Sequence, residues 1–212
     1  MTVLEPVADI LVRLRDLPAE AILADAAGRY AGRVAFATSL GIADQVVTHM
    51  LAEAGLGIPI FTIDTGRLFP ETHDLIERTS ERYGVSIAVY CPDAADVEQM
   101  IARDGVNLFR HGAFNRDLCC ETRKVKPLRR AQLGLDVWIC ARHRGGPAES
   151  ETLEPAVWDA SAGLVTINPL AAWDEAAVWD YARAHDVPFN PLHAQGFATI
   201  DCAPCPSPVR PG

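Results

Sequence analysis

The sequence predicts an α/β protein built on a mostly parallel sheet with helices on both faces. Short apolar runs typical of buried strands alternate with longer stretches in which apolar residues recur at helical spacing. The chain of 212 residues can bury one core without staples, and 49% hydrophobic with 22% charged residues is typical of a globular protein. We therefore expect one domain over residues 1–212.

Each element follows from its own stretch of sequence. Residues 1–30 form an expected helical region, because apolar and polar residues alternate at helical spacing over 5–27. The expected strands are residues 33–38, 58–63, 86–90, 137–140 and 164–167. The other expected helices are residues 42–54, 70–83, 93–103 and 174–185. Residues 188–212 are rich in Pro and Gly and have no period, which predicts an irregular tail.

Charge and hydropathy exclude several classes of function. A net charge of −9 argues against nucleic-acid binding. No apolar run approaches the ~18–20 residues of a membrane span and no secretory signal opens the chain, so we expect a cytoplasmic protein without a membrane partner. Seven of the 19 cations nevertheless lie between residues 110 and 130. Such a local basic patch favours a small anionic ligand or an anionic cluster.

Two cysteine pairs are the strongest local signal. Cys119 and Cys120 are adjacent, and Cys202 and Cys205 form a CxxC motif. Four thiolates in two close pairs can hold an iron–sulfur cluster or a zinc ion; the alternative is a buried pair beside an unrelated redox-active CxxC. The adjacent pair suits the larger [4Fe-4S] cube better than tetrahedral zinc. The nearby cations would offset the negative charge of such a cluster.

Two polar turns follow the first two expected strands, at the edge of the sheet where ligands bind in such folds. The first contains Ser39, Leu40, Gly41 and Asp44. Backbone N–H groups and a hydroxyl there can cradle an anion, although most such junctions only cap the helix. The second turn, residues 64–67, is either part of the same site or an ordinary turn with a solvated arginine. Together the two turns favour a nucleotide site.

These residues resemble one family. From about Ala35 to Cys205 the sequence resembles the cluster-containing adenosine 5'-phosphosulfate (adenylyl-sulfate) reductases, a branch of the phosphoadenosine phosphosulfate (PAPS) reductase family. The matching motifs are TSLG at 38–41, TIDTGRL at 62–68, CCETRKVKPL at 119–128, INPLAAW at 167–173, VPFNPLH at 187–193 and CAPC at 202–205. The combination of CC, RK and CxxC separates the 5'-phosphosulfate branch from the cluster-free 3'-phospho branch.

The resemblance implies a PP-loop (adenine nucleotide alpha hydrolase-like) fold and a reaction. Adenosine 5'-phosphosulfate would be reduced to sulfite and AMP, with thioredoxin as reductant, in assimilatory sulfate reduction and cysteine biosynthesis. In that family a cysteine thiolate attacks the sulfur, releases AMP and forms an S-sulfocysteine, from which thioredoxin releases sulfite. The resemblance leaves open whether the chain forms a homo-oligomer.

The resemblance also assigns residues to roles. A [4Fe-4S] cluster would be held by Cys119, Cys120, Cys202 and Cys205, the last two in the irregular tail. The cluster would structure the site without cycling electrons. Lys124 would lie between the cluster and the substrate anion, in support of catalysis. The implied substrate-binding residues are Ser39, Leu40, Gly41, Asp44, Asp64, Thr65, Gly66, Arg67, Lys124 and Arg144.

The sequence departs from the family pattern in its charges. Ala43 replaces an acidic residue, and His143 and Ser150 stand where arginines are expected, with Arg142 as a candidate to compensate. Each lost charge-assisted contact to a buried anion weakens binding by roughly 1.5–3 kcal/mol.

The reactive thiol is the larger departure. The family carries its nucleophilic cysteine in a tail beyond the CxxC, and this chain stops at Gly212 without that tail. Besides the four predicted cluster ligands, Cys91 and Cys140 remain. Cys91 follows an expected strand and is typical of a small core residue, whereas Cys140 adjoins the arginine loop. Either Cys140 or another chain would then supply the nucleophile.

Three other functions stay open at this point. The first is a non-catalytic or truncated homologue that binds a cluster and an adenine nucleotide without sulfur transfer. The second is a PP-loop ATPase that adenylates a carbonyl, which needs a fuller Ser-Gly-Gly phosphate loop than residues 39–44 supply. The third is a zinc-stapled interaction module, which would be colourless where an iron–sulfur protein is coloured.

Overall fold

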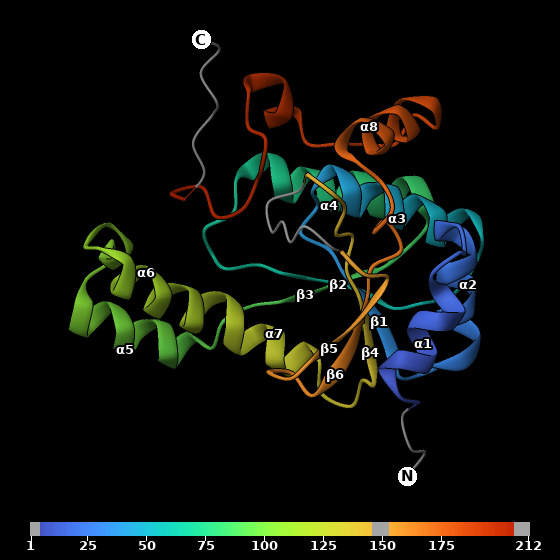
Figure 1. The fold of residues 1–212 in the computed structure, drawn as a ribbon. Helices are drawn as coiled ribbons and strands as arrows, with labels where there is room; N and C mark the ends of the chain where they lie inside the picture. Colours follow the sequence, from blue (N-terminus) through green and yellow to red (C-terminus); the bar gives the residue numbers. More distant parts are fainter. Residues whose placement is uncertain (1–4, 146–152, 206–212) are drawn as a thin grey trace.

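A computed structural model describes residues 5–145 and 153–205 of the protein (Figure 1). The described strands form one six-stranded sheet in the order β3-β2-β1-β4-β6-β5. They are β1 (Val34–Ala37), β2 (Ile60–Ile63), β3 (Ile87–Tyr90), β4 (Val137–Ile139), β5 (Ala156–Asp159) and β6 (Leu164–Ile167). Neighbouring strands are parallel except for the edge strand β5, which runs antiparallel to β6. The predicted mostly parallel α/β class is confirmed.

The predicted helices are present, and two further helices lie between residues 113 and 131, where none was expected. They are α1 (Val7–Leu14), α2 (Ala19–Arg29), α3 (Ile42–Glu53), α4 (Pro70–Tyr83), α5 (Ala94–Asp104), α6 (Ala113–Cys120), α7 (Lys126–Ala131) and α8 (Glu175–Ala184). Short 3₁₀ turns are η1 (Leu108–Arg110) and η3 (Pro191–Gln195), and η2 (Glu121–Val125) is a π turn.

The structure refines the predicted elements. The helical region expected over residues 1–30 consists of two helices, because Pro18 adopts an extended backbone and cannot donate a helical hydrogen bond. The expected strands did not include β5. The irregular tail contains the short turn η3, whose Asn190 side chain accepts a hydrogen bond from the Leu192 N–H. That the whole chain is one domain stays a prediction.

Alternation along β1 gives the sheet two apolar faces. Val34 and Phe36 belong to the main core, which also contains buried residues of α2, α3 and α8. Ala35 on the other face packs with Phe61 and with Ala131 of α7. Figure 1 shows α5 and α6 projecting beyond the edge strand β3. Helices therefore cover both faces, as the sequence predicts.

The strand order creates a place for a ligand. The chain proceeds from β1 to β2 and β3 on one side, whereas β4 lies on the other side of β1. Ligands in open α/β sheets bind at such a reversal, beside the carboxyl ends of the strands. The loops after β1, β2 and β4 meet there. No helix among residues 5–145 and 153–205 is both long and apolar enough to cross a membrane.

A buried histidine on α3 makes stability depend on pH. The ring of His49 is packed among Tyr83, Tyr181 and His185, with centroids 5.1–5.8 Å apart. Burial lowers the pKa of His49 below its ordinary value of 6.5, and the charges of His185 and Arg82 add to this effect. The unfolded chain therefore takes up this proton more readily than the folded protein. Protonation of His49 favours unfolding.

We expect the contribution of His49 to stability to be complete above about pH 6.5 and to be lost as the pH falls below that value. The variant His49→Phe should flatten the decrease in unfolding free energy between about pH 7.5 and 5.5. Urea unfolding at the two pH values measures it. The exposed His111 gives the control, because His111→Phe should leave the decrease unchanged. An equal decrease in both variants would contradict the prediction.

Candidate active site

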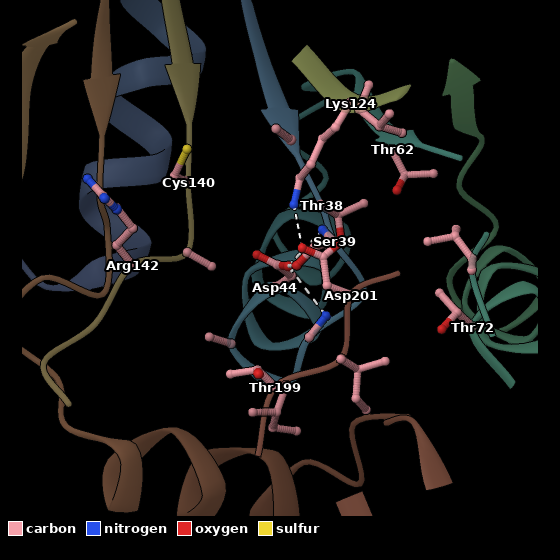
Figure 2. A pocket seen from close by; sticks show the side chains of 18 of the residues that line it. Thr38, Ser39, Asp44, Thr62, Thr72, Lys124, Cys140, Arg142, Thr199 and Asp201 are labelled. Carbon is pink, nitrogen blue, oxygen red and sulfur yellow. Dashed lines mark hydrogen bonds and ion pairs between the residues drawn. The ribbon is translucent and has the colours of Figure 1, made fainter. Parts of the chain in front are cut away.

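A cavity of about 570 Å³ lies at the carboxyl ends of β1, β2 and β4, a volume in the range of small-molecule sites. Its walls come from several parts of the chain: β1 and the start of α3, β2 and the start of α4, η2 and α7, β4 and the segment after it, and η3 with the tail at 198–201. Figure 2 shows Lys124 and Ser39 pointing into this space, with Cys140 and Arg142 on the side of β4. Its charged groups come from Asp44, Lys124, Arg142 and Asp201.

The β1–α3 loop is folded around the carboxylate of Asp44. Oδ2 of Asp44 accepts hydrogen bonds from the Ser39 N–H at 2.7 Å, the Ser39 hydroxyl at 2.5 Å and the Gly41 N–H at 3.4 Å. Leu40 between them adopts φ of 61°. Burial raises the pKa of Asp44, and the hydrogen bonds from Ser39 oppose that rise. The loop therefore has the donors for an oxyanion and already holds one from its own helix.

Lys124 carries positive charge into the cavity from η2. Its Nζ lies 2.6 Å from Oδ2 of Asp201, and both side chains are about half exposed. Burial opposes the charged form, but the carboxylate of Asp201 outweighs it and the pKa of Lys124 is raised. Lys124 is thus a charged ammonium in direct contact with the Asp201 carboxylate inside the cavity (Figure 2). A π turn such as η2 often occurs at functional sites.

The four predicted cluster ligands lie in two segments near Lys124, with Cys120 close to Cys119 and Cys205, and Cys202 close to Cys205. Burial raises the pKa of Cys120, and the neighbouring Cys119 and Cys205 raise it further while Lys124 opposes them. Burial raises the pKa of Cys202 to about 11.

The CxxC segment is held on the β2 loop by specific contacts. The sulfur of Cys202 lies 3.0 Å from the Thr65 hydroxyl, and the Ala203 N–H donates to the Arg67 carbonyl at 2.8 Å. Four thiols from two segments are the donor chemistry that an iron–sulfur cluster takes. Among the described residues, no three of these side chains lie close enough together to hold a metal ion.

The cavity contains half of the predicted substrate-binding residues. Ser39, Gly41, Asp44, Thr65 and Lys124 line it. Ala43, one of the departures from the family pattern, also contributes to the wall, as do Arg142 and His143. Ser150 lies outside the described residues. The assignment of these residues to substrate binding stays a prediction.

The other five predicted residues do not line this cavity. Leu40 is buried in the core. Asp64 accepts from the Gly66 N–H, and both border a second cavity of about 300 Å³ next to Cys91. The guanidinium of Arg67 donates to the Val106 carbonyl and lies 5.0 Å from the ring centroid of Phe109. The guanidinium of Arg144 donates to the Ala172 carbonyl. Both arginines are turned away from the cavity by nearby acceptors.

Sequence reasoning missed several residues of the cavity wall. Four are threonines, at positions 38, 62, 72 and 199, which add hydroxyl groups to the wall. The fifth is Asp201, whose carboxylate occupies Lys124. The available signal was the position of Asp201 directly before Cys202. A cluster shared by Cys202 and Cys120 would bring Asp201 close to Lys124 in the basic stretch.

Cys140 lies in the wall but is not an activated nucleophile. Burial raises the pKa of its thiol strongly, and the carboxylate of Asp44 raises it further while Arg142 opposes them. A reactive cysteine needs the opposite environment, because the thiolate is the nucleophile. The hypothesis that Cys140 attacks the substrate therefore lacks support in this geometry.

We expect Cys140 to react with iodoacetamide at least about tenfold more slowly than the exposed Cys91 at neutral pH, because Cys140 is held as a thiol. Peptide mass spectrometry of the folded protein over time measures both rates. The two rates should become similar in denaturant, which is the control. Faster labelling of Cys140 than of Cys91 in the folded protein would restore it as a candidate nucleophile.

The sequence pattern of the phosphoadenosine phosphosulfate reductase domain matches residues 33–208. The chain belongs to this family. Among curated relatives, an adenosine 5'-phosphosulfate reductase of Burkholderia cepacia is 40% identical over 193 residues, covering 91% of this chain and 77% of the relative. One of Sinorhizobium fredii (strain USDA 257) is 42% identical over 194 residues, covering 89% and 77%.

Solved structures of the family and beyond share the fold. The phosphoadenylyl-sulfate reductase of Candida auris, in a phosphate complex, superposes with a TM-score of 0.82 at 25% identity, covering 95% of this chain and 96% of that one. Yeast FAD synthetase in complex with FAD has a TM-score of 0.58 at 16% identity over 95% of this chain and 68% of that one, a likeness of fold alone. The predicted PP-loop type of fold is confirmed.

Proposed function

We propose that this chain binds adenosine 5'-phosphosulfate and reduces it to sulfite and AMP, with thioredoxin as the reductant, in sulfate assimilation and cysteine biosynthesis. The observation that carries the proposal is the cavity into which Lys124 and the Ser39–Asp44 loop both point. Lys124 in turn lies near Cys120 and Cys202 of the two thiol pairs. Relatives that share about 40% of their residues with this chain are named for this substrate. A reducing compartment such as the cytoplasm suits the free thiols.

The cavity provides separate groups for the two halves of this substrate. Apolar walls and threonine hydroxyls, among them Thr62 and Thr72, suit an adenine and a ribose. The ammonium of Lys124 and the N–H groups of the β1–α3 loop suit the phosphate and sulfate oxygens. As the sulfur–oxygen bond to AMP breaks, Lys124 stabilises the negative charge that develops on the phosphate.

The residues that would hold a [4Fe-4S] cluster are Cys119, Cys120, Cys202 and Cys205. When bound, such a cluster supplies a fixed anionic centre that ties the end of α6 to the CxxC segment. The chain's own part is to present four thiols and to place Lys124 between them and the cavity.

We expect Cys205→Ser to lose iron and visible absorbance after anaerobic purification, whereas Cys91→Ser keeps both. A colourless, iron-free wild-type protein would contradict the cluster.

The reaction needs a thiolate that attacks the sulfate sulfur. A sulfur–sulfur bond forms, the sulfur–oxygen bond breaks, and AMP leaves with the electron pair. A thioredoxin thiolate then attacks the cysteine sulfur and sulfite leaves. Among the described residues that line the cavity, Cys140 is the one cysteine, and its thiol is not activated. All six cysteines of the sequence lie among the described residues, and four of them are the proposed cluster ligands. Peptide mapping of the sulfonate adduct is therefore the measurement that assigns the attacking thiol.

A single-turnover experiment tests this function. Anaerobically purified protein is incubated with ³⁵S-labelled adenosine 5'-phosphosulfate, and protein-bound sulfonate and free AMP are measured. The proposal expects both products in equal amounts, and release of labelled sulfite when reduced thioredoxin is added. Peptide mapping then identifies the modified cysteine. Tight binding without an adduct would overturn the enzyme proposal for this chain.

That same outcome would favour the second candidate, a homologue that binds a cluster and an adenine nucleotide without sulfur transfer. One observation favours this candidate: the described part of the cavity holds the binding groups but no activated thiol. Binding of AMP is common to both candidates. The sulfonate adduct is what separates them.

A further inference from the structure

We propose that Asp201 is an internal competitor for the anionic part of the substrate, so that a phosphate or sulfate oxygen that binds Lys124 must displace this carboxylate or share the ammonium with it. This inference rests on the proposed function and deepens it, because it concerns how the same cavity selects and admits its ligand. Two observations carry it: the geometry of the ion pair and the place of Asp201 in the tail.

The ion pair fills the position that an anionic ligand needs. Oδ2 of Asp201 lies 2.6 Å from Nζ of Lys124, and both residues line the cavity. A carboxylate oxygen at this distance is chemically similar to a phosphate or sulfate oxygen bound to an ammonium. The described cavity wall contains no other lysine. A ligand that uses the ammonium of Lys124 therefore has to displace Asp201 or share the cation with it.

The second anion-binding element of the cavity is occupied in the same way. Asp44 accepts the N–H groups of Ser39 and Gly41, which are the donors of the β1–α3 loop. Lys124 and the N–H groups of the β1–α3 loop thus each contact a carboxylate of the protein. The two differ in their anchoring: Asp44 belongs to α3, whereas Asp201 belongs to a tail without regular structure. Asp201 is the carboxylate that can leave with less disturbance of the fold.

Release of Asp201 is coupled to the CxxC segment. Oδ1 of Asp201 accepts the Cys202 N–H at 2.9 Å, so one carboxylate joins Lys124 to the backbone of Cys202. The next residues stay attached to the β2 loop through Ala203 and Thr65. A ligand that takes Lys124 therefore changes a contact of the CxxC backbone while the rest of the segment remains in place.

The chain supplies a matched control for this ion pair. Its second lysine, Lys126, forms a comparable pair with Asp96, with 2.8 Å between Nζ and Oδ2 and similar exposure of both side chains. Neither Lys126 nor Asp96 lines the cavity. Asp96→Asn removes one negative charge and one lysine pair, as Asp201→Asn does, without changing the site.

The test measures equilibrium binding of AMP and of uncharged adenosine to the anaerobically purified protein by calorimetry. We expect Asp201→Asn to bind AMP about threefold to tenfold more tightly than wild type, since a half-exposed ion pair no longer opposes the ligand. Its affinity for adenosine should stay the same. Asp96→Asn should match the wild type for both ligands. Asp201→Ser should repeat the effect, and the iron content and the unfolding midpoint of both variants are recorded with the binding data.

The outcomes separate this inference from the function on which it rests. If the wild type binds AMP and both Asp201 variants bind it equally or more weakly, the inference is overturned and the function stands. A gain for adenosine as large as that for AMP also overturns it, because charge is then not the cause. Unfolding of both Asp201 variants would assign the residue a structural role and overturn the inference. If neither the wild type nor the variants bind AMP or adenosine 5'-phosphosulfate, both proposals fall.

Discussion

Replacing Lys124 with methionine is expected to weaken the binding of adenosine 5'-phosphosulfate and AMP by about 10- to 100-fold. A hydrogen bond to a charged group contributes roughly 1.5–3 kcal/mol, and each 1.4 kcal/mol is about a factor of ten. Methionine keeps the length and apolar stem of the side chain and removes the ammonium. Rates under saturating substrate should fall as well, because the same charge stabilises the departing AMP. Calorimetry with AMP and single-turnover rates with the labelled substrate measure the two effects.

The control for this variant is Lys126→Met. Both lysines belong to the same basic stretch, but Lys126 pairs with Asp96 outside the cavity. Its replacement should change AMP affinity by less than about twofold, the scale of an exposed ion pair. Equal losses in the two variants would mean that the overall positive charge of the stretch matters and that the position of Lys124 does not.

Replacing Phe36 with alanine is expected to lower the free energy of unfolding by about 3–5 kcal/mol. Phe36 lies in the middle of β1, has none of its surface exposed and belongs to the main core. Truncation removes its buried ring and leaves a cavity that the central strand cannot close. Because β1 leads directly into the loop of Ser39 and Gly41, AMP binding should weaken with stability. Urea unfolding followed by circular dichroism measures the change.

Phe114 provides the comparison at constant chemistry. It lies on α6 with 80% of its surface exposed. Phe114→Ala should change stability by no more than about 0.5 kcal/mol. If Phe36→Ala lowers stability as little as Phe114→Ala does, the core around β1 is packed far more loosely than the burial of Phe36 indicates.

The strands that the sequence predicted are those with a continuous apolar run. β1, β2, β3, β4 and β6 each have such a run between turn residues. β5 escaped prediction because its apolar run is only three residues long, Ala156 to Trp158, between Pro155 and Asp159. Its pairing with β6 comes from the fold, which no local pattern records. The helical region expected over residues 1–30 contains two helices, and Pro18 directly before the second one marks their boundary in the sequence.

The sequence predicted the cavity residues whose position follows from the backbone of a strand end or a helix. Ser39, Gly41 and Lys124 lie in the cavity because a strand end or a helix places them there. Arg67 and Arg144 do not, because a long side chain can reach any carbonyl within its radius, and Val106 and Ala172 are nearer than the cavity. Side-chain direction of this kind depends on neighbours that are distant in sequence. The pairing of Lys124 with Asp201, 77 positions apart, is another such case.

The π turn η2 lies between α6 and α7, so the number of residues in it sets how the two helices are rotated relative to each other. It joins α6, which ends at Cys120, to α7, which packs on β2 and β3. Within it, buried Arg123 donates to the Thr65 carbonyl while Lys124 points into the cavity. Deleting one residue would turn everything beyond it by about 100°. Either α7 would lose its packing on β2 and β3, or Cys119 and Cys120 at the end of α6 would turn away from the CxxC segment. The number of residues between these cysteines and the sheet is therefore fixed by the fold.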